Sequence, residues 1–131
     1  MSQHDLLADR DRLIAVVGAT DTPGKYGGII YRDLRGRGHR VVAVNPNHDT
    51  VAGDRCYPNL ASLPERPEIV NMVVPARVGR TVVAEWERLS GDSIWFQPGA
   101  YDRELKEQAR KAGMDVVAGD CIMVVSRTRA A

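Results

Sequence analysis

Short apolar runs alternate with amphipathic segments along the chain. Five runs of four to six residues are apolar almost throughout, and they span residues 13–18, 41–44, 69–74, 93–97 and 114–119. Runs of this length are typical of strands that are buried on both faces of a sheet. We therefore expect about five core strands, joined by helices and loops.

The segments between the runs show helical spacing. Residues 25–37 are expected to form a helix that stops at Gly38, and a helix beginning at Asp102 is expected to close at Gly113. A further helix, between the third and fourth runs, has one apolar face. That face consists of Val78, Val82, Trp86 and Leu89.

Strands that alternate with helices indicate a parallel sheet with right-handed crossovers. We predict an α/β fold, with a Rossmann-like, doubly wound, mainly parallel sheet of about five strands flanked by helices. Residues 1–131 are expected to form one domain with a flexible N-terminus over residues 1–11. Residues 121–125 are expected to add an edge segment to the sheet.

Residues 45–67 contain Pro, Gly and Asn but show little helical periodicity. We expect a long irregular connection there, with a short strand at residues 55–58 and one helical turn at residues 60–64.

In doubly wound sheets, ligands bind beyond the carboxyl ends of the strands, where the strand order reverses. The residues that follow each strand are therefore candidates for a site. They are Gly18, Ala19 and Thr20, then Asn45 and Pro46, Pro75 and Ala76, Gln97, Pro98 and Gly99, and finally Gly119, Asp120 and Cys121.

The loop after the first run, GATDTPGKYGG, has the glycines and the lysine of a phosphate-binding loop. It departs in two ways from the Walker A pattern, GxxxxGK[ST]. Five residues instead of four separate Gly18 from Gly24, and Tyr26 follows Lys25 where a magnesium-binding hydroxyl is required. We therefore reject hydrolysis of nucleoside triphosphates.

The dinucleotide fingerprint, GxGxxG, is also incomplete. Thr20 stands where the middle glycine admits a pyrophosphate, and Asn45 and Pro46 follow the second strand, where an acidic residue binds the ribose of NAD. Both departures argue against NAD. The missing acid alone leaves NADP open, although an arginine is then expected nearby.

The loop retains the general features of a pyrophosphate site. Backbone N–H groups at the start of a helix, the hydroxyl of Thr20 and the charge of Lys25 all favour an anion. Asn45 can hydrogen-bond a ribose or an adenine, while Pro46 and Pro75 offer stiff apolar walls. Each feature alone also fits an ordinary turn or a solvated side chain. The hypothesis of a site depends on their meeting at one edge of the sheet.

Composition narrows the class of protein. Hydrophobic residues make up 44% and charged residues 27% of the 131 residues, which is typical of a folded globular domain. The formal net charge of +1 provides no global field that attracts nucleic acid or an anionic membrane. The N-terminal residues do not read as a signal peptide, and Cys56 and Cys121 form no CxxC pair, so we expect a cytoplasmic protein.

Five motifs in order resemble the small stand-alone CoA-binding domain proteins, which are similar to the N-terminal CoA-binding domain of the succinyl-CoA synthetase α-subunit. The motifs are AVVGATDTPGKYGGII, VVAVNPNHDTVAGDRCYPNL, MVVPARVG, WFQPGAYD and GDCIMVV. The resemblance implies a Rossmann-type fold and CoA or an acyl-CoA as the ligand. It implies cofactor-binding roles for Gly18, Ala19, Thr20, Lys25, Val44, Asn45, Pro46, Val74, Pro75, Gln97, Pro98 and Gly99.

This sequence departs from the family pattern at Ala76, which replaces the usual second proline after Pro75. The ribose of CoA carries a 3′-phosphate, so the absence of an acid after the second strand fits CoA. Either Lys25 or Arg40 is expected to meet that phosphate.

We expect a non-catalytic module with no catalytic residue and no bound metal, whose protein partner is unknown. The synthetase reaction needs a phosphorylated histidine on a second domain and a β-subunit, and 131 residues leave room for neither. The alternative is an enzyme, either an NAD(P)-type redox protein or a ligase fragment that requires a partner chain. His4, His39 and His48 are expected to be surface residues, with only His48 at the ligand edge.

Cys121 follows the last predicted strand and is expected near the same edge of the sheet. CoA ends in a thiol, so a path past Cys121 permits a mixed disulfide. A cysteine that begins an apolar segment is also typical of a small buried hydrophobe. Both interpretations stay open at this point.

Overall fold

The five apolar runs form the parallel core of one seven-stranded sheet. The structure is a computed structural model that describes residues 1–128. The strand order is β3-β4-β2-β1-β5-β6-β7, and all neighbouring strands are parallel except for the pair β3 and β4. The predicted Rossmann-like α/β class is confirmed. The strands are β1 (Leu13–Val17), β2 (Arg40–Val44), β3 (Thr50–Val51), β4 (Asp54–Tyr57), β5 (Ile69–Met72), β6 (Ser93–Phe96) and β7 (Asp115–Ala118).

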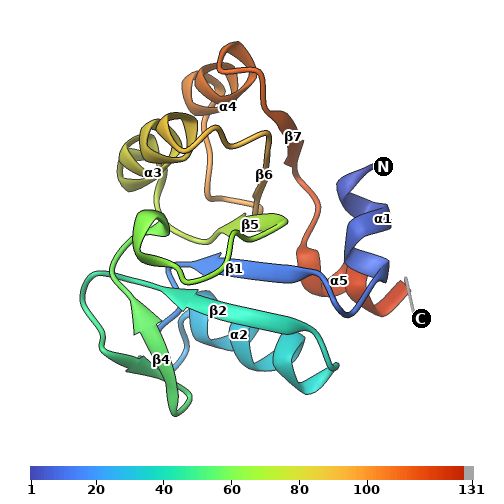
Figure 1. The fold of residues 1–131 in the computed structure, drawn as a ribbon, viewed down its shortest axis with the longest axis vertical. Coiled ribbons are helices and arrows are strands. Elements are labelled where there is room, and N and C mark those ends of the chain that lie inside the picture. Colours follow the sequence, from blue (N-terminus) through green and yellow to red (C-terminus); the bar gives the residue numbers. More distant parts are fainter. Residues whose placement is uncertain (129–131) are drawn as a thin grey trace.

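Helices cover both faces of the sheet (Figure 1). On one face, α1, α2 and α5 enclose a core that includes Ile14 and Trp95, and on the other, α3 and α4 enclose a core that includes Val70 and Phe96. The helices are α1 (Gln3–Ala8), α2 (Tyr26–Gly36), α3 (Ala76–Arg88), α4 (Arg103–Lys111) and α5 (Ile122–Thr128), with one 3₁₀ turn, η1 (Leu60–Ser62).

Local signals begin and end the helices where the sequence predicts. The carboxylate of Asp102 accepts a hydrogen bond of 2.8 Å from the backbone N–H of Leu105 at the start of α4. Gly38 and Gly113 follow α2 and α4 with φ angles of 88° and 84°, which glycine adopts without a steric penalty. Strand β4 and turn η1 lie on the predicted short strand and helical turn of the long connection.

The turn from β1 into α2 requires glycine. Gly18 has a φ of 102°, and a Cβ on Gly27 would overlap the carbonyl oxygen of Gly18. Gly27 therefore lets the first turn of α2 pack directly against the end of β1. Since β2 and β5 lie on opposite sides of β1, this turn lies at the point where the strand order reverses.

The C-terminal segment differs from its prediction. Residues 121–125 do not form an edge strand, because α5 begins at Ile122. Ile122, Met123 and Ser126 are buried on one face of this helix, and the backbone N–H of Ile122 donates to Oε1 of Gln97 at 2.8 Å. An apolar run of this length fits a buried helix as well as a strand.

The N-terminal segment has more structure than a flexible tail. Ser2 and Asp5 form a capping box at the start of α1, and Leu7 is fully buried against the sheet. The side chain of Gln3 also donates to the backbone oxygens of Ile94 and Asp115, each at 3.1 Å. Burial of one leucine and these hydrogen bonds hold α1 on the β6–β7 edge of the sheet.

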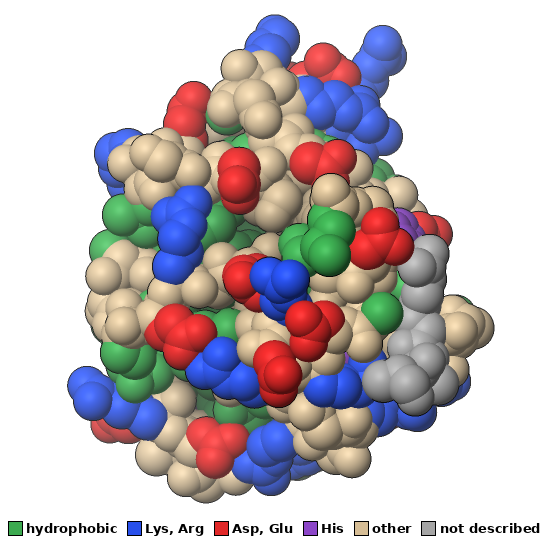
Figure 2. Space-filling model, turned by 45° about the vertical axis from the view of Figure 1, so that its right-hand side comes forward, with side chains coloured by type: hydrophobic (Ala, Val, Ile, Leu, Met, Phe, Trp, Pro, Cys, Tyr) green, Lys and Arg blue, Asp and Glu red, His purple; other side chains and the backbone are tan. Residues whose placement is uncertain are grey.

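Charge is spread over the surface. On the face in Figure 2, acidic and basic side chains are interspersed, in keeping with the net charge of +1. Among residues 1–128, no helix has the length and apolar character needed to span a bilayer.

Candidate functional site

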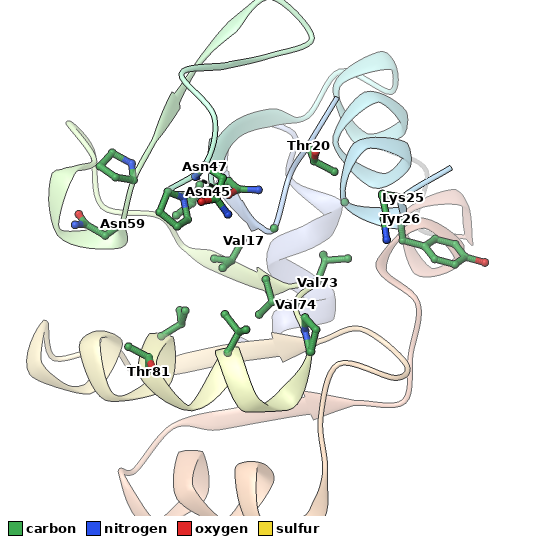
Figure 3. Close-up of a pocket in the computed structure, with 18 of the residues that line it drawn as sticks. Val17, Thr20, Lys25, Tyr26, Asn45, Asn47, Asn59, Val73, Val74 and Thr81 are labelled. Atoms are coloured by element: carbon green, nitrogen blue, oxygen red, sulfur yellow. Dashed lines mark hydrogen bonds between the residues drawn. The ribbon is translucent and has the colours of Figure 1, made fainter. Parts of the chain in front are cut away.

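Two adjoining cavities lie at the carboxyl edge of the sheet. The first has a volume of about 720 Å³ and lies between the loops after β1, β2 and β4 and the first turns of α3 (Figure 3). It brings together eight of the residues that the resemblance implied. They are Gly18, Thr20, Lys25, Val44, Asn45, Pro46, Val74 and Pro75.

The second cavity has a volume of about 410 Å³ and holds the remaining predicted motif, Gln97, Pro98 and Gly99. Cys121 and Ala100 also line this second cavity. The two cavities share a wall, which consists of Tyr26, Val73, Val74 and Pro75.

Two helices begin at the first cavity without a capping side chain. Lys25 is the N-cap of α2 and Pro75 is the N-cap of α3, and neither side chain makes a capping hydrogen bond. The backbone N–H groups of a helix's first turn lack partners within the helix, and they carry the positive end of its dipole. Lys25 and Arg77 are exposed at these ends, which makes this region of the cavity electropositive.

Thr20 is the central polar side chain of the first loop. It is only 8% exposed, and its hydroxyl accepts a hydrogen bond of 3.1 Å from the backbone N–H of Thr22. Nε2 of His48 lies 2.9 Å from the same hydroxyl oxygen. His48, expected to be a surface residue, is therefore half-buried behind the loop and lines neither cavity.

Asn45 fastens the loop after β2 to the loop after β1. Its amide nitrogen donates to the carbonyl oxygen of Ala19 at 3.0 Å, and its amide oxygen accepts from the backbone N–H of Asn47 at 2.9 Å. Ala19 is fully buried and lines neither cavity, so its carbonyl serves the site through Asn45.

Helix α3 contributes an apolar wall to the site. The buried face of α3 consists of Gly79, Val83 and Trp86, whereas Val78 and Val82 line the first cavity and Val78 is 41% exposed. The predicted apolar face of this helix is therefore divided: Val78 and Val82 line the cavity, whereas Trp86 is buried in the core.

Other lining residues were also missed, because the long connection and α3 carry many of them. They are Val17, Thr22, Tyr26, Gly27, Asn47, Pro58, Asn59, Val73, Arg77 and Thr81.

Arg40, one of two residues expected to meet a 3′-phosphate, lies at the wrong edge. It begins β2 opposite Leu13, the first residue of β1, so it is at the amino edge of the sheet. Its guanidinium pairs with both carboxylate oxygens of Glu65, at 3.0 and 2.6 Å, and this ion pair raises the pKa of Arg40. Lys25 and Arg77 are the cations that line the first cavity.

The two cysteines differ in access. Cys121 is half-buried in the wall of the second cavity, where Nε2 of Gln97 lies 3.4 Å from its sulfur. Cys56 is 6% exposed in β4, and burial raises the pKa of its thiol. Within residues 1–128, no group of three His, Cys, Asp or Glu residues is arranged to hold a metal ion.

The relatives of this chain include ligases that are much longer than it and a protein of similar length. The chain is 30% identical over 125 residues to ADP-forming acetate–CoA ligase I of Archaeoglobus fulgidus, a match that covers 88% of this chain and 18% of the ligase. It thus spans less than a fifth of that relative. It is 25% identical to the uncharacterized protein YneT of Bacillus subtilis, with 90% and 87% of the two chains covered.

Solved structures give the same picture. A conserved hypothetical protein from Pyrococcus furiosus has 42% identity and a TM-score of 0.83, with 86% of this chain and 97% of that chain covered. The dinucleotide-forming acetyl-coenzyme A synthetase 1 of Ca. Korarchaeum cryptofilum, solved with phosphate and ADP, has 27% identity and a TM-score of 0.74 over 88% of this chain and 27% of its own. The CoA binding domain family matches residues 12–127, from β1 into α5, and the protein belongs to this family.

Proposed function

We propose that the chain binds CoA or an acyl-CoA through the nucleotide part of the ligand, as a non-catalytic module. The observation that carries the proposal is that, in the described part of the chain, positively charged groups gather at the first cavity and acidic ones do not. Lys25, Arg77 and two uncapped helix N-termini meet at one cavity, while among residues 1–128 no Asp or Glu lines either cavity. A pyrophosphate and a 3′-phosphate need this kind of site.

The residues present fit such a ligand. Thr20, Lys25 and the first-turn N–H groups of α2 would hold the pyrophosphate. Asn45 would meet the ribose or the adenine, with Pro46 and the Val78–Val82 stripe as apolar walls. A cavity of about 720 Å³ is within the ordinary range of small-molecule sites, about 300–1,000 Å³.

The second cavity supports a path for the pantetheine arm. It adjoins the first along Val74 and Pro75, and Gln97 and Ala100 give it both polar and apolar surface. An arm that leaves the nucleotide would pass this wall toward Cys121. When bound, CoA supplies a thiol that carries acyl groups.

The related ligases favour a narrower version of the same function, in which the chain presents CoA to another protein. None of the three histidines lines either cavity, which supports a role in binding rather than in phosphoryl transfer by this chain. That other protein would then be the partner of this chain, and it would determine which acyl group is used.

Thermal unfolding in the presence of CoA, acetyl-CoA, NADH, NADPH and ATP tests the proposal. A ligand that binds only the native state stabilises it by about 2.7 kcal/mol at a hundredfold excess over Kd. We expect an increase in Tm with CoA or acetyl-CoA. An increase with NADH and none with either CoA compound would overturn the proposal.

A further inference from the structure

The hydroxyl of Thr20 can make its hydrogen bonds in more than one arrangement. A threonine hydroxyl has one proton to donate and two lone pairs to accept with. The backbone N–H of Thr22 occupies one lone pair at 3.1 Å. One proton and one lone pair remain for His48 and for anything bound in the first cavity.

His48 decides how those remaining positions are used. If Nε2 of His48 carries a proton, it donates to Thr20 across 2.9 Å, and the proton of Thr20 is free to turn to Oγ1 of Thr22 at 3.1 Å or to a ligand. If Nε2 is bare, Thr20 must donate to His48 and has no proton left for a phosphate oxygen. In the neutral ring, Nε2 carries the proton in one tautomer and is bare in the other, whereas the protonated ring always donates from Nε2. Protonation of His48 therefore fixes Thr20 as a donor toward Thr22 or the cavity.

The Asp21 carboxylate lies close enough to His48 for the two groups to interact electrostatically. The hydrogen bond from the backbone N–H of Ala52 lowers the pKa of the Asp21 carboxyl group, and Arg32 and then His48 add smaller effects in the same direction. Asp49, which follows His48 in the sequence, provides a second carboxylate on the same loop. Asp21 is paired with Arg32 of α2. A phosphate at Thr20, which Lys25 would also contact, would add a further negative charge beside the hydroxyl that Nε2 of His48 contacts.

We propose that His48 is a positioning residue for phosphate recognition. In its protonated form it supports binding, and it makes binding of the pyrophosphate of CoA stronger as the pH falls from 8 to 6. The inference rests on the proposed function, because the phosphate at Thr20 is that of CoA. Histidine is the side chain whose ordinary charge change falls between about pH 5 and 8.

The choice of ligand matters for the test. A phosphate monoester such as the 3′-phosphate of CoA loses its second proton at about pH 6. That titration would obscure a change in the protonation of His48. Dephospho-CoA lacks that group, and its pyrophosphate does not titrate in this range. Binding of dephospho-CoA should therefore be measured by calorimetry from pH 6 to pH 8, with CoA measured alongside at pH 7.

We expect the wild type to bind dephospho-CoA roughly three- to tenfold more tightly at pH 6 than at pH 8, since charge-assisted hydrogen bonds are the stronger ones. In His48→Gln, whose amide donates at every pH, the affinity should be the same at both. Thr20→Val should weaken binding and also remove the pH dependence. His4→Gln, at a histidine whose Nε2 contacts Asp120 rather than Thr20, should keep the wild-type profile.

Proton uptake gives a readout that needs no variant. Titrations of the wild type with dephospho-CoA at pH 7, in two buffers of different ionisation enthalpy, should show net uptake of part of a proton on binding. His48→Asn serves as a second variant if His48→Gln does not fold.

The outcomes separate the two proposals. Binding of dephospho-CoA with no proton uptake, or with the same pH dependence in the wild type and in the His48 variants, overturns the role of His48 and leaves the proposed function standing. No binding of CoA or of dephospho-CoA overturns both.

Discussion

Lys25 is the clearest single residue of the candidate site. It lies at the N-cap of α2, lines the first cavity and, among residues 1–128, forms no salt bridge. A lysine ammonium without an acidic partner is available to an anion, and the uncapped helix behind it has the same sign of charge.

We predict that Lys25→Ala weakens CoA binding by roughly ten- to a hundredfold, because charge-assisted hydrogen bonds are worth about 1.5–3 kcal/mol. Calorimetric titration measures the change, with thermal unfolding to show that the variant is folded. Arg40→Ala is the matched control, since Arg40 lies at the opposite edge and pairs with Glu65. Unchanged affinity in a folded Lys25→Ala variant would contradict the prediction and show that Lys25 is only a solvated surface residue.

Cys121 allows a second test at this scale. It lines the second cavity, so we predict that CoA disulfide forms an adduct there. The thiolate of Cys121 attacks one sulfur of CoA disulfide, the disulfide between the two CoA molecules breaks, and a CoA thiolate leaves. Intact mass should show one added CoA in the wild type and in Cys56→Ser, but none in Cys121→Ser. An adduct that maps to Cys56 alone would contradict the prediction, and burial of Cys56, which raises its pKa, argues against that outcome.

At the scale of elements, the site depends on how closely α2 approaches β1. Gly27 has no room for a side chain, because a Cβ would overlap the backbone oxygen of Gly18. Backbone atoms cannot move aside as the end of a flexible side chain can. The close contact between α2 and the end of β1 therefore requires glycine at position 27.

We predict that Gly27→Ala destabilises the protein by about 1–3 kcal/mol and weakens CoA binding, because the first turn of α2 must shift away from the cavity. Gly36→Ala is the control: it lies in the same helix, a Cβ there would have nothing within 4 Å, and it should be neutral or stabilising by about 0.5–1 kcal/mol. Urea unfolding gives both values. Equal stability of the two variants would show that the close approach is not needed.

At the scale of the whole molecule, His39 links β2 to the C-terminal helix. It was expected at the surface but is 4% exposed, and Nε2 lies 2.8 Å from the hydroxyl of Ser126 in α5. Burial, with a smaller contribution from Arg10, lowers the pKa of His39 to about 4. The folded protein therefore holds this histidine neutral while the unfolded chain protonates it near its ordinary pKa.

Since the pKa of His39 is lower in the folded state, its contribution to stability is present above about pH 6.5 and is lost as the pH falls toward 4. We predict that the free energy of unfolding drops by roughly 2 kcal/mol between pH 7 and pH 5 because of this residue. Urea unfolding at the two pH values should show the drop in the wild type and a much smaller one in His39→Gln. A drop of the same size in both proteins would assign it to other groups.

Local patterns were enough to predict the core strands, the helix ends and most of the candidate site. Apolar runs, Asp102 and the glycines at positions 18, 38 and 113 act on their immediate neighbours, so their effect can be deduced without the rest of the fold. Because the carboxyl ends of parallel strands meet at one edge, the loops after β1, β2, β5 and β6 were also predicted to lie together, and the two cavities contain their residues.

Long-range packing settles which face each residue presents and which distant residues meet. The spacing of Val78 and Val82 is the same for a core face as for a cavity wall, and only the packing of α3 against β5 and α4 separates them. Residues 122–125 form a helix rather than a strand because one face of α5 is buried against α2. The contact between His48 and Thr20 joins residues 28 positions apart. No local pattern encodes such a pair, because its distance depends on how two separate loops fold back over the same edge of the sheet.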